Sequence, residues 1–168
     1  MDFIPPWEAL HPLVVHFPIA LLTIAPLFVL LAVVFSKYTK PFLICAAILL
    51  GIGTLGSYVS VSTGEAAAHA KNLDIEEEAR GALPAELGDM YNVFEFHKEM
   101  AGFAAHAHAV LFVLLLVLAF GSSYVKALRP KWLLVLWLVL SAGALVLLGL
   151  AGHAGARLVH EFGITGGM

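Results

Sequence analysis

The sequence has few charged residues and only one cysteine. Charged side chains make up 12% of its 168 residues, whereas about a quarter is typical of a soluble domain. This scarcity and a hydrophobic share of 61% exclude an ordinary soluble domain and indicate a membrane protein. The single Cys45 excludes an internal disulfide and the CxxCH attachment site of c-type haem. The net charge of -3 has the wrong sign for a nucleic acid partner, so none is expected.

Four apolar runs are long enough to cross a bilayer, which takes roughly 20 residues. Backbone groups find no other partners in lipid, so each run is expected to be a helix. The runs cover residues 10–35, 41–61, 100–124 and 132–153. Short connections favour antiparallel neighbours, so the sequence predicts an all-α integral membrane protein. Its fold would be an up-down four-helix bundle, with residues 1–168 forming a single transmembrane domain.

The connections between the spans differ in charge. The short loops SKYTKP and GSSYVKALRPKW hold lysine and arginine but no acidic residue. The long connection at residues 63–99 is acidic and is expected to carry a short surface helix at residues 74–82. By the positive-inside rule the short loops face the cytoplasm. Both termini and the acidic loop would then lie on the outer side. The first residues have no basic segment, so no cleavable signal peptide is expected.

All eight histidines fall on the outer side of the predicted bundle. They are His11, His16, His69, His97, His106, His108, His153 and His160. A rise of about 1.5 Å per residue puts four of them inside the apolar zone, namely His16, His106, His108 and His153. Ionisable residues in lipid are costly and usually face the bundle interior. These four are therefore the stronger candidates for a functional site.

Small residues recur at helical spacing on two of the spans. The stripes are Gly53, Ser57, Ser60 and Gly64 on the second span, and Gly149, Gly152 and Gly155 on the fourth. Such stripes can let helices pack closely, or they can leave room for a large flat ligand between helices. Histidines on the same side of the bundle favour the second interpretation, because a macrocycle needs both space and axial nitrogen ligands.

Three interpretations of the histidines remain open. The first is b-type haem, one or two groups, held by pairs of imidazoles in the bundle core. Cations near the outer surface would meet its propionates, and the candidates are Arg157, Lys98, Lys71 and Arg80. The second is a copper or zinc site of three or four histidines, with Glu95 beside His97 as a further donor. The third is a non-catalytic structural or assembly subunit of a respiratory complex, whose histidines only bond between helices.

Three motifs resemble a known family. HPLVVHFPIALL in the first span, Thr63-Gly64 after the second and GARLVHEFGI after the fourth resemble small bacterial predicted membrane proteins of undefined function. The resemblance covers residues 10–164, and His11, His16 and His97 match the family's positions best. It implies a four-helix membrane fold in a redox setting, since members are often encoded near cytochromes or redox enzymes. It assigns no activity.

We therefore expect a membrane b-type cytochrome in the bacterial inner (cytoplasmic) membrane, with its histidine-rich face toward the periplasm. It would transfer electrons as a subunit of a redox complex, between quinol or redox subunits and a periplasmic carrier, and would not be a self-contained enzyme. A homodimer or larger complex in the lipid membrane is expected. The first choice of axial ligands is His16 with His108, and His97 with His153 is the second. His11 and His106 would be hydrogen-bond partners, propionate contacts or alternates, as would His69 and His160.

Overall fold

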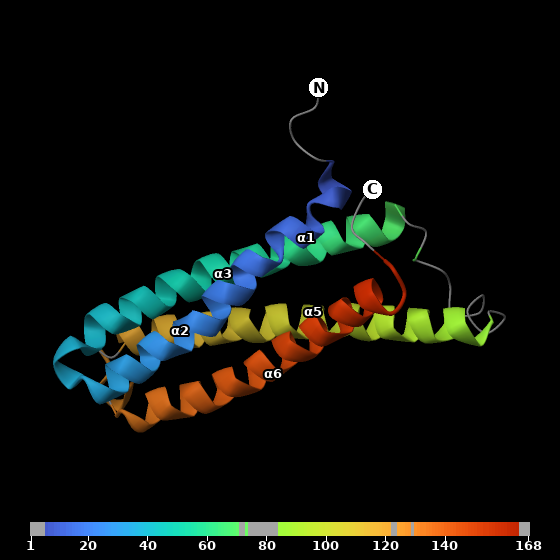
Figure 1. Ribbon diagram of the computed structural model, residues 1–168. Coiled ribbons are helices and arrows are strands. Elements are labelled where there is room, and N and C mark those ends of the chain that lie inside the picture. Colours follow the sequence, from blue (N-terminus) through green and yellow to red (C-terminus); the bar gives the residue numbers. More distant parts are fainter. Residues whose placement is uncertain (1–5, 71–72, 74–83, 122–123, 129, 165–168) are drawn as a thin grey trace.

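The computed structural model describes residues 6–70, 73, 84–121, 124–128 and 130–164. These residues form helices and short connections (Figure 1). The long elements are α2 (His16–Val34), α3 (Thr39–Ala70), α5 (Ala85–Leu116) and α6 (Trp132–His160). The short elements are η1 (Trp7–Ala9), α1 (His11–Val14), η2 (Ser36–Tyr38), the π-helical turn η3 (Val117–Gly121) and η4 (Lys126–Leu128).

Four helical stretches are long and apolar enough to cross a membrane, which confirms the predicted all-helical membrane fold. They are His11–Val34, Ser36–Ala70, Ala85–Gly121 and Trp132–His160. The first stretch is interrupted at Val15, between α1 and α2. Pro18 has no N–H, so the carbonyl of Val14 lacks its usual helical partner there. Pro26 lies inside α2 without ending it.

The helices form two antiparallel hairpins, α2 with α3 and α5 with α6 (Figure 1). The hairpins meet where α3 packs against α5 and α2 packs against α6. The first and third helices therefore lie at diagonal corners of the bundle. The described starts of α1 and α5 and the ends of α3 and α6 share one end of the molecule, while the α2–α3 and α5–α6 connections share the other. We call the first the histidine end and the second the loop end.

The helices α3 and α5 are longer than the predicted spans. Residues 63–70 and 85–99, which were expected in the acidic loop, continue α3 and begin α5. The extensions are held together by a small apolar cluster in which Ala68, Phe94 and Leu158 are buried. At about 1.5 Å per residue, the 32 residues of α5 span about 48 Å, more than the roughly 30 Å hydrocarbon core. The surface helix expected at residues 74–82 lies outside the described residues.

The main hydrophobic core fills the half of the bundle near the loop end. Leu22, Val29, Leu50 and Leu115 are almost fully buried in it. Trp137 of α6 is also buried and donates its indole N–H to the carbonyl of Leu111 on α5, at 2.9 Å. Because large side chains fill this half, the space for a ligand lies in the other half.

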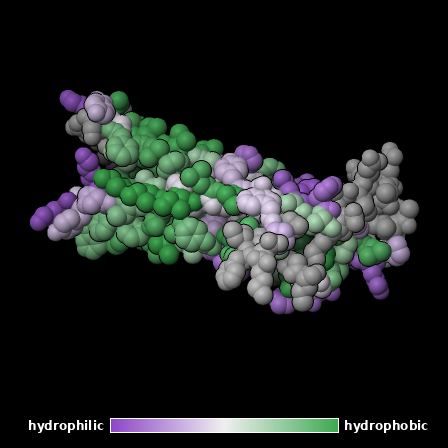
Figure 2. All heavy atoms as spheres, turned by 90° about the horizontal axis from the view of Figure 1, so that it is seen from above, coloured by the Kyte–Doolittle hydropathy of each residue, from purple (hydrophilic) through white to green (hydrophobic). Residues whose placement is uncertain are grey.

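Charge is divided between the two ends. The described acidic side chains all lie at the histidine end, namely Glu65, Glu86, Asp89, Glu95, Glu99 and Glu161. The loop end carries Lys37, Lys40, Lys126 and Lys131. Figure 2 shows a continuous hydrophobic area over the half near the loop end and more polar side chains over the other half. The predicted orientation rests on this division of charge.

Candidate functional site

A largely apolar cavity of about 720 Å³ lies among the helices at the histidine end. Four histidines line it, namely His11, His16, His97 and His160. Much of the remaining wall is made of small residues, including Ser57, Ser60, Gly64, Ala68, Ala101, Ala104, Ala151, Gly152 and Gly155. Its size falls within the roughly 300–1,000 Å³ that is usual for small-molecule sites. Part of each small-residue stripe therefore borders this space.

Two of the lining imidazoles lie close together. His11 on α1 and His97 on α5 have ring centres 6.4 Å apart, with ring planes at 83°. The two residues are 86 positions apart in sequence, and the fold alone brings them together. Among the candidate histidines, this is the pair that the structure places side by side.

Each of these rings is fixed by a hydrogen bond to another helix. Nδ1–H of His11 donates to the carbonyl of Ser60 at 2.8 Å, with the Thr63 hydroxyl oxygen at 3.3 Å. Nδ1–H of His97 donates to the carbonyl of Ala151 on α6 at 2.8 Å. A carbonyl can only accept, so Nδ1 carries the hydrogen and Nε2 of the neutral ring keeps its lone pair. Metal-binding histidines are typically oriented in this way.

A glycine of the neighbouring helix lies against each ring. A Cβ atom added to Gly64 of α3 would lie 3.0 Å from Cε1 of His11. A Cβ atom added to Gly155 of α6 would lie 3.0 Å from Cε1 of His97. Both distances are tighter than ordinary van der Waals contact. Any other residue at these two positions would therefore push the imidazole away from its place.

The structure does not bring His16 and His108 to one site. His16 lines the cavity, is exposed, and donates Nδ1–H to the Pro12 carbonyl one turn earlier at 3.0 Å. His108 is 1% exposed, does not line the cavity, and donates Nδ1–H to the Ala104 carbonyl at 2.8 Å. Its buried Nε2 has no hydrogen-bond partner among the described residues.

The remaining histidines lie apart from the His11–His97 pair. His106 is exposed, donates Nδ1–H to the Gly102 carbonyl at 2.6 Å, and has its ring centre 5.7 Å from that of Tyr58. His69 and His153 are exposed and do not line the cavity, whereas His160 lines it near the end of α6. His97 was expected to pair with His153 of α6. In the structure, His97 contacts α6 through its hydrogen bond to the Ala151 carbonyl.

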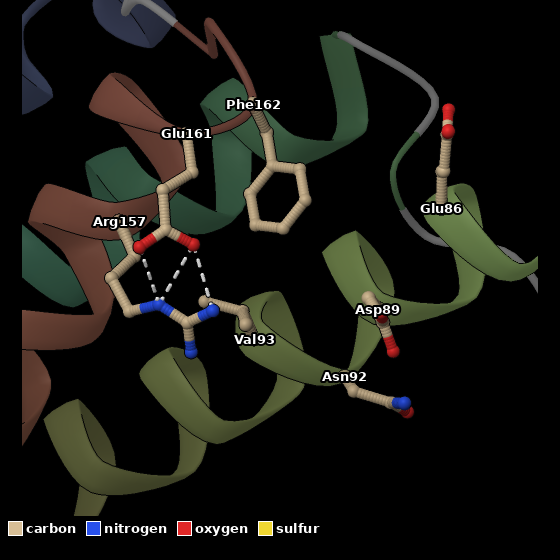
Figure 3. A pocket seen from close by; sticks show the side chains of 7 residues that line it. All are labelled: Glu86, Asp89, Asn92, Val93, Arg157, Glu161 and Phe162. Atoms are coloured by element: carbon tan, nitrogen blue, oxygen red, sulfur yellow. Dashed lines mark hydrogen bonds and ion pairs between the residues drawn. The ribbon is translucent and has the colours of Figure 1, made fainter.

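Arg157 does not line the large cavity. It lies in a shallow surface hollow with Glu86, Asp89 and Glu161 (Figure 3). Its guanidinium donates three hydrogen bonds of 2.7–3.0 Å to the carboxylate of Glu161, which lowers the pKa of that carboxyl. The described cation that does line the cavity is Lys98, which is paired with Glu95 at 2.9 Å. The other two expected cations, at positions 71 and 80, lie outside the described residues.

Within the described part of the chain, no group of three or more His, Cys, Asp or Glu side chains gathers as a metal site would require. Zinc sites usually take three or four protein ligands. A haem needs only two axial nitrogens, because the macrocycle supplies the other four. The His11–His97 pair offers two imidazoles, the number of axial ligands that a haem takes.

Sequence reasoning did not identify the residues that orient the two rings. Ala151 and Ser60 act through backbone carbonyls, which every residue possesses, so their side chains give no signal. Gly64 and Gly155 did give one, because both belong to small-residue stripes on the histidine side.

A family model described as "Predicted membrane protein (DUF2231)" matches residues 8–167. The chain belongs to this family, whose function is unknown, and the resemblance drawn from its motifs is confirmed. No curated protein and no solved structure matches the chain.

Proposed function

We propose that this member of the DUF2231 family is a membrane b-type cytochrome whose haem lies between His11 and His97. The observation that carries the proposal is the pair itself. Two imidazoles lie 6.4 Å apart at an apolar cavity, and each is anchored through Nδ1–H to the backbone of another helix. The preferred axial pair thus moves from His16 with His108 to His11 with His97.

The spacing of the rings fits a metal held between them. Metal ions bind imidazole nitrogens at about 2.0–2.1 Å, and the ring centre lies about 1 Å beyond the nitrogen. Two rings on opposite sides of one metal would therefore have centres roughly 6 Å apart. The ring centres of His11 and His97 are 6.4 Å apart, so one metal between them could reach both rings.

The cavity fits the rest of a haem group. A porphyrin is flat and apolar, and small residues such as Ala101 and Gly152 leave room for it between the helices. The propionates of a haem are charged and need exposed partners, and Lys98 and His160 both line the cavity and are exposed. Of the four cations expected near the propionates, Lys98 is the one proposed to meet them.

A haem held by His11 and His97 would supply reversible one-electron transfer. The chain's own residues hold the group, exclude water from its apolar faces and keep both imidazoles neutral. No residue set for bond-making chemistry is needed, so the protein acts as an electron-transfer subunit.

The charge of the two ends supports an orientation and a partner. The lysine-bearing loop end would face the cytoplasm and the acidic histidine end the periplasm of a bacterial inner membrane. The haem would exchange electrons with a periplasmic carrier on one side and with quinol or a redox subunit in the membrane on the other. In this proposal the chain works as a homodimer or as part of a larger redox complex.

The test is a spectrum of the purified protein. In detergent, we expect a Soret band, a reduced-minus-oxidised spectrum of b type and a positive pyridine haemochrome assay. Copper or zinc by elemental analysis, without a Soret band, would instead establish the bare-metal alternative. A preparation free of both metals that cannot take up added haem would overturn the proposal and favour a structural or assembly subunit.

A further inference from the structure

The bundle holds a second pair of polar groups, deeper than the cavity. His108 of α5 and Thr54 of α3 are buried, and His108 Nε2 and Thr54 Oγ1 have no hydrogen-bond partner among the described residues. Leaving a buried polar group unpaired is costly, so an unpaired group in a protein core calls for an explanation. Here two such groups occur in one bundle.

The contacts on either side place His108 and Thr54 in the same layer of the α3–α5 interface. Toward the loop end, Gly51 packs against Phe112, since an added Cβ would lie 3.0 Å from the Phe112 ring. Toward the histidine end, the rings of Tyr58 and His106 are 5.7 Å apart. The helices are antiparallel, so His108 and Thr54 lie between these two contacts, each on its own helix.

This layer is isolated from charge. The bundle helices that surround His108 carry no Asp, Glu, Lys or Arg at residues 17–35, 41–64, 101–121 or 133–156. The other titratable groups on these stretches are Cys45, Tyr58, His106 and His153, and all four are exposed. The buried hydroxyls of α3 are those of Thr54, Ser57, Ser60 and Thr63, and Ser141 of α6 is buried as well. His108 is thus the buried titratable group of these four stretches.

Buried hydroxyls recur along α3 between the cavity and this layer. They belong to Thr54, Ser57, Ser60 and Thr63, at every third residue. The hydroxyls of Ser57, Ser60 and Thr63 each donate to a backbone carbonyl of α3 itself, at 2.7–3.0 Å, and both Ser57 and Ser60 line the cavity. The α3 side of the core is therefore more polar between the cavity and His108 than it is toward the loop end.

We propose that His108 is a buried proton-binding site that takes up a proton when the haem site gains an electron. This inference rests on the proposed function. The electron comes from the reduced redox partner and enters the haem. The proton comes from water at the cavity mouth and forms the Nε2–H bond of His108. One negative and one positive charge enter the bundle together, so its net charge is unchanged.

The coupling follows from distance. His97, the proposed haem ligand on the same helix, is eleven residues from His108, which is about 16 Å along the helix axis. A negative charge added at roughly that distance, at an effective dielectric constant of about 20, raises the proton affinity of an imidazole roughly fivefold. Because linkage is reciprocal, the proton makes reduction easier by the same factor.

The experiment is a redox titration of the haem protein in detergent across a series of pH values. The midpoint potential is expected to fall as pH rises, by about 40 mV in total for a fivefold change in proton affinity. His108→Gln removes the titrating group but keeps a polar side chain, and it is expected to abolish this fall. His106→Gln, which changes an exposed histidine of the same helix, is expected to keep it. A potential that does not depend on pH, or an unchanged dependence in His108→Gln, would overturn the proposal.

A second measurement separates this proposal from the haem proposal. ¹⁵N NMR of histidine-labelled protein follows protonation of His108 Nε2 with or without haem. The isosteric Thr54→Val removes the other unpaired polar atom of this layer, so protonation of His108 should become less favourable. A ring that stays neutral throughout the stable pH range, or a titration that Thr54→Val leaves unchanged, would overturn the proton site. Failure of the haem proposal shows itself separately, as the lack of a Soret band.

Discussion

His11 and His97 belong to helical segments at diagonal corners of the bundle, yet their ring centres lie 6.4 Å apart. Each ring donates to a backbone carbonyl of the helix beside it, Ser60 for His11 and Ala151 for His97. Each also packs on a glycine of that same helix. The α1–α3 pair and the α5–α6 pair thus hold their histidines in the same way, and the cavity borders both rings.

The glycine contacts give the first prediction. Gly155→Ala should move the His97 ring by a few tenths of an ångström and weaken haem binding about tenfold, as changes that misorient a metal-binding histidine typically do. Gly149→Ala on the same helix has open space for its Cβ and serves as the matched control. Haem titration of both apo variants measures the difference. Equal affinities would show that Gly155 does not set the ring position.

Arg157 gives the second prediction. Arg157→Gln should leave haem content unchanged, because Arg157 does not line the cavity. The same variant should raise the pKa of Glu161 toward its ordinary value of about 4.3, which ¹³C NMR of the glutamate carboxyls measures. Loss of haem in this variant would restore Arg157 as a propionate contact.

The lowered pKa of Glu161 also fixes the sign of a small pH effect. A carboxyl whose folded-state pKa is depressed contributes stability above its unfolded pKa, and this contribution is lost as pH falls through the folded-state value. The pair is exposed, so the contribution is small and screened by salt. In Arg157→Gln this part of the acid dependence of unfolding should disappear, and an unchanged acid dependence would contradict it.

The orientation gives the third prediction. In a Cys45→Ser background, the cysteine of Asp89→Cys should react with a membrane-impermeant maleimide added to spheroplasts. The cysteine of Lys126→Cys should react only after the membrane is broken, because its loop would face the cytoplasm. The reverse labelling pattern would place the histidine end, and the proposed electron exchange, on the cytoplasmic side.

The number and kind of the helices could be predicted from the sequence, because lipid allows few alternatives to helices of about 20 apolar residues. The lengths of α3 and α5 could not. Their extensions at residues 63–70 and 85–99 are partly polar, and tertiary packing around Phe94 and Leu158 holds them in place. Hydropathy alone shows the part of a helix that is in lipid and not the part that continues beyond it.

The gathering of histidines at one end could also be predicted, but their pairing could not. Depth favoured His16 and His108, on the assumption that the site lies within the apolar zone. In the structure, large side chains fill that zone, and the cavity opens nearer the histidine end, beside the longer ends of α3 and α5. The interruption at Val15 separates α1, with His11, from α2, with His16. The angle between the two side chains therefore cannot be calculated from the regular turn of one continuous helix, about 3.6 residues.

The most direct test of the account is the ligation state of ferric haem in four single variants. His11→Ala and His97→Ala should each lose the six-coordinate low-spin signal in electron paramagnetic resonance, and added imidazole should restore it. His106→Ala and His153→Ala change exposed histidines outside the cavity and should keep the wild-type signal. A wild-type signal in His11→Ala or His97→Ala, or its loss in a control variant, would contradict the proposal that these two imidazoles hold the haem.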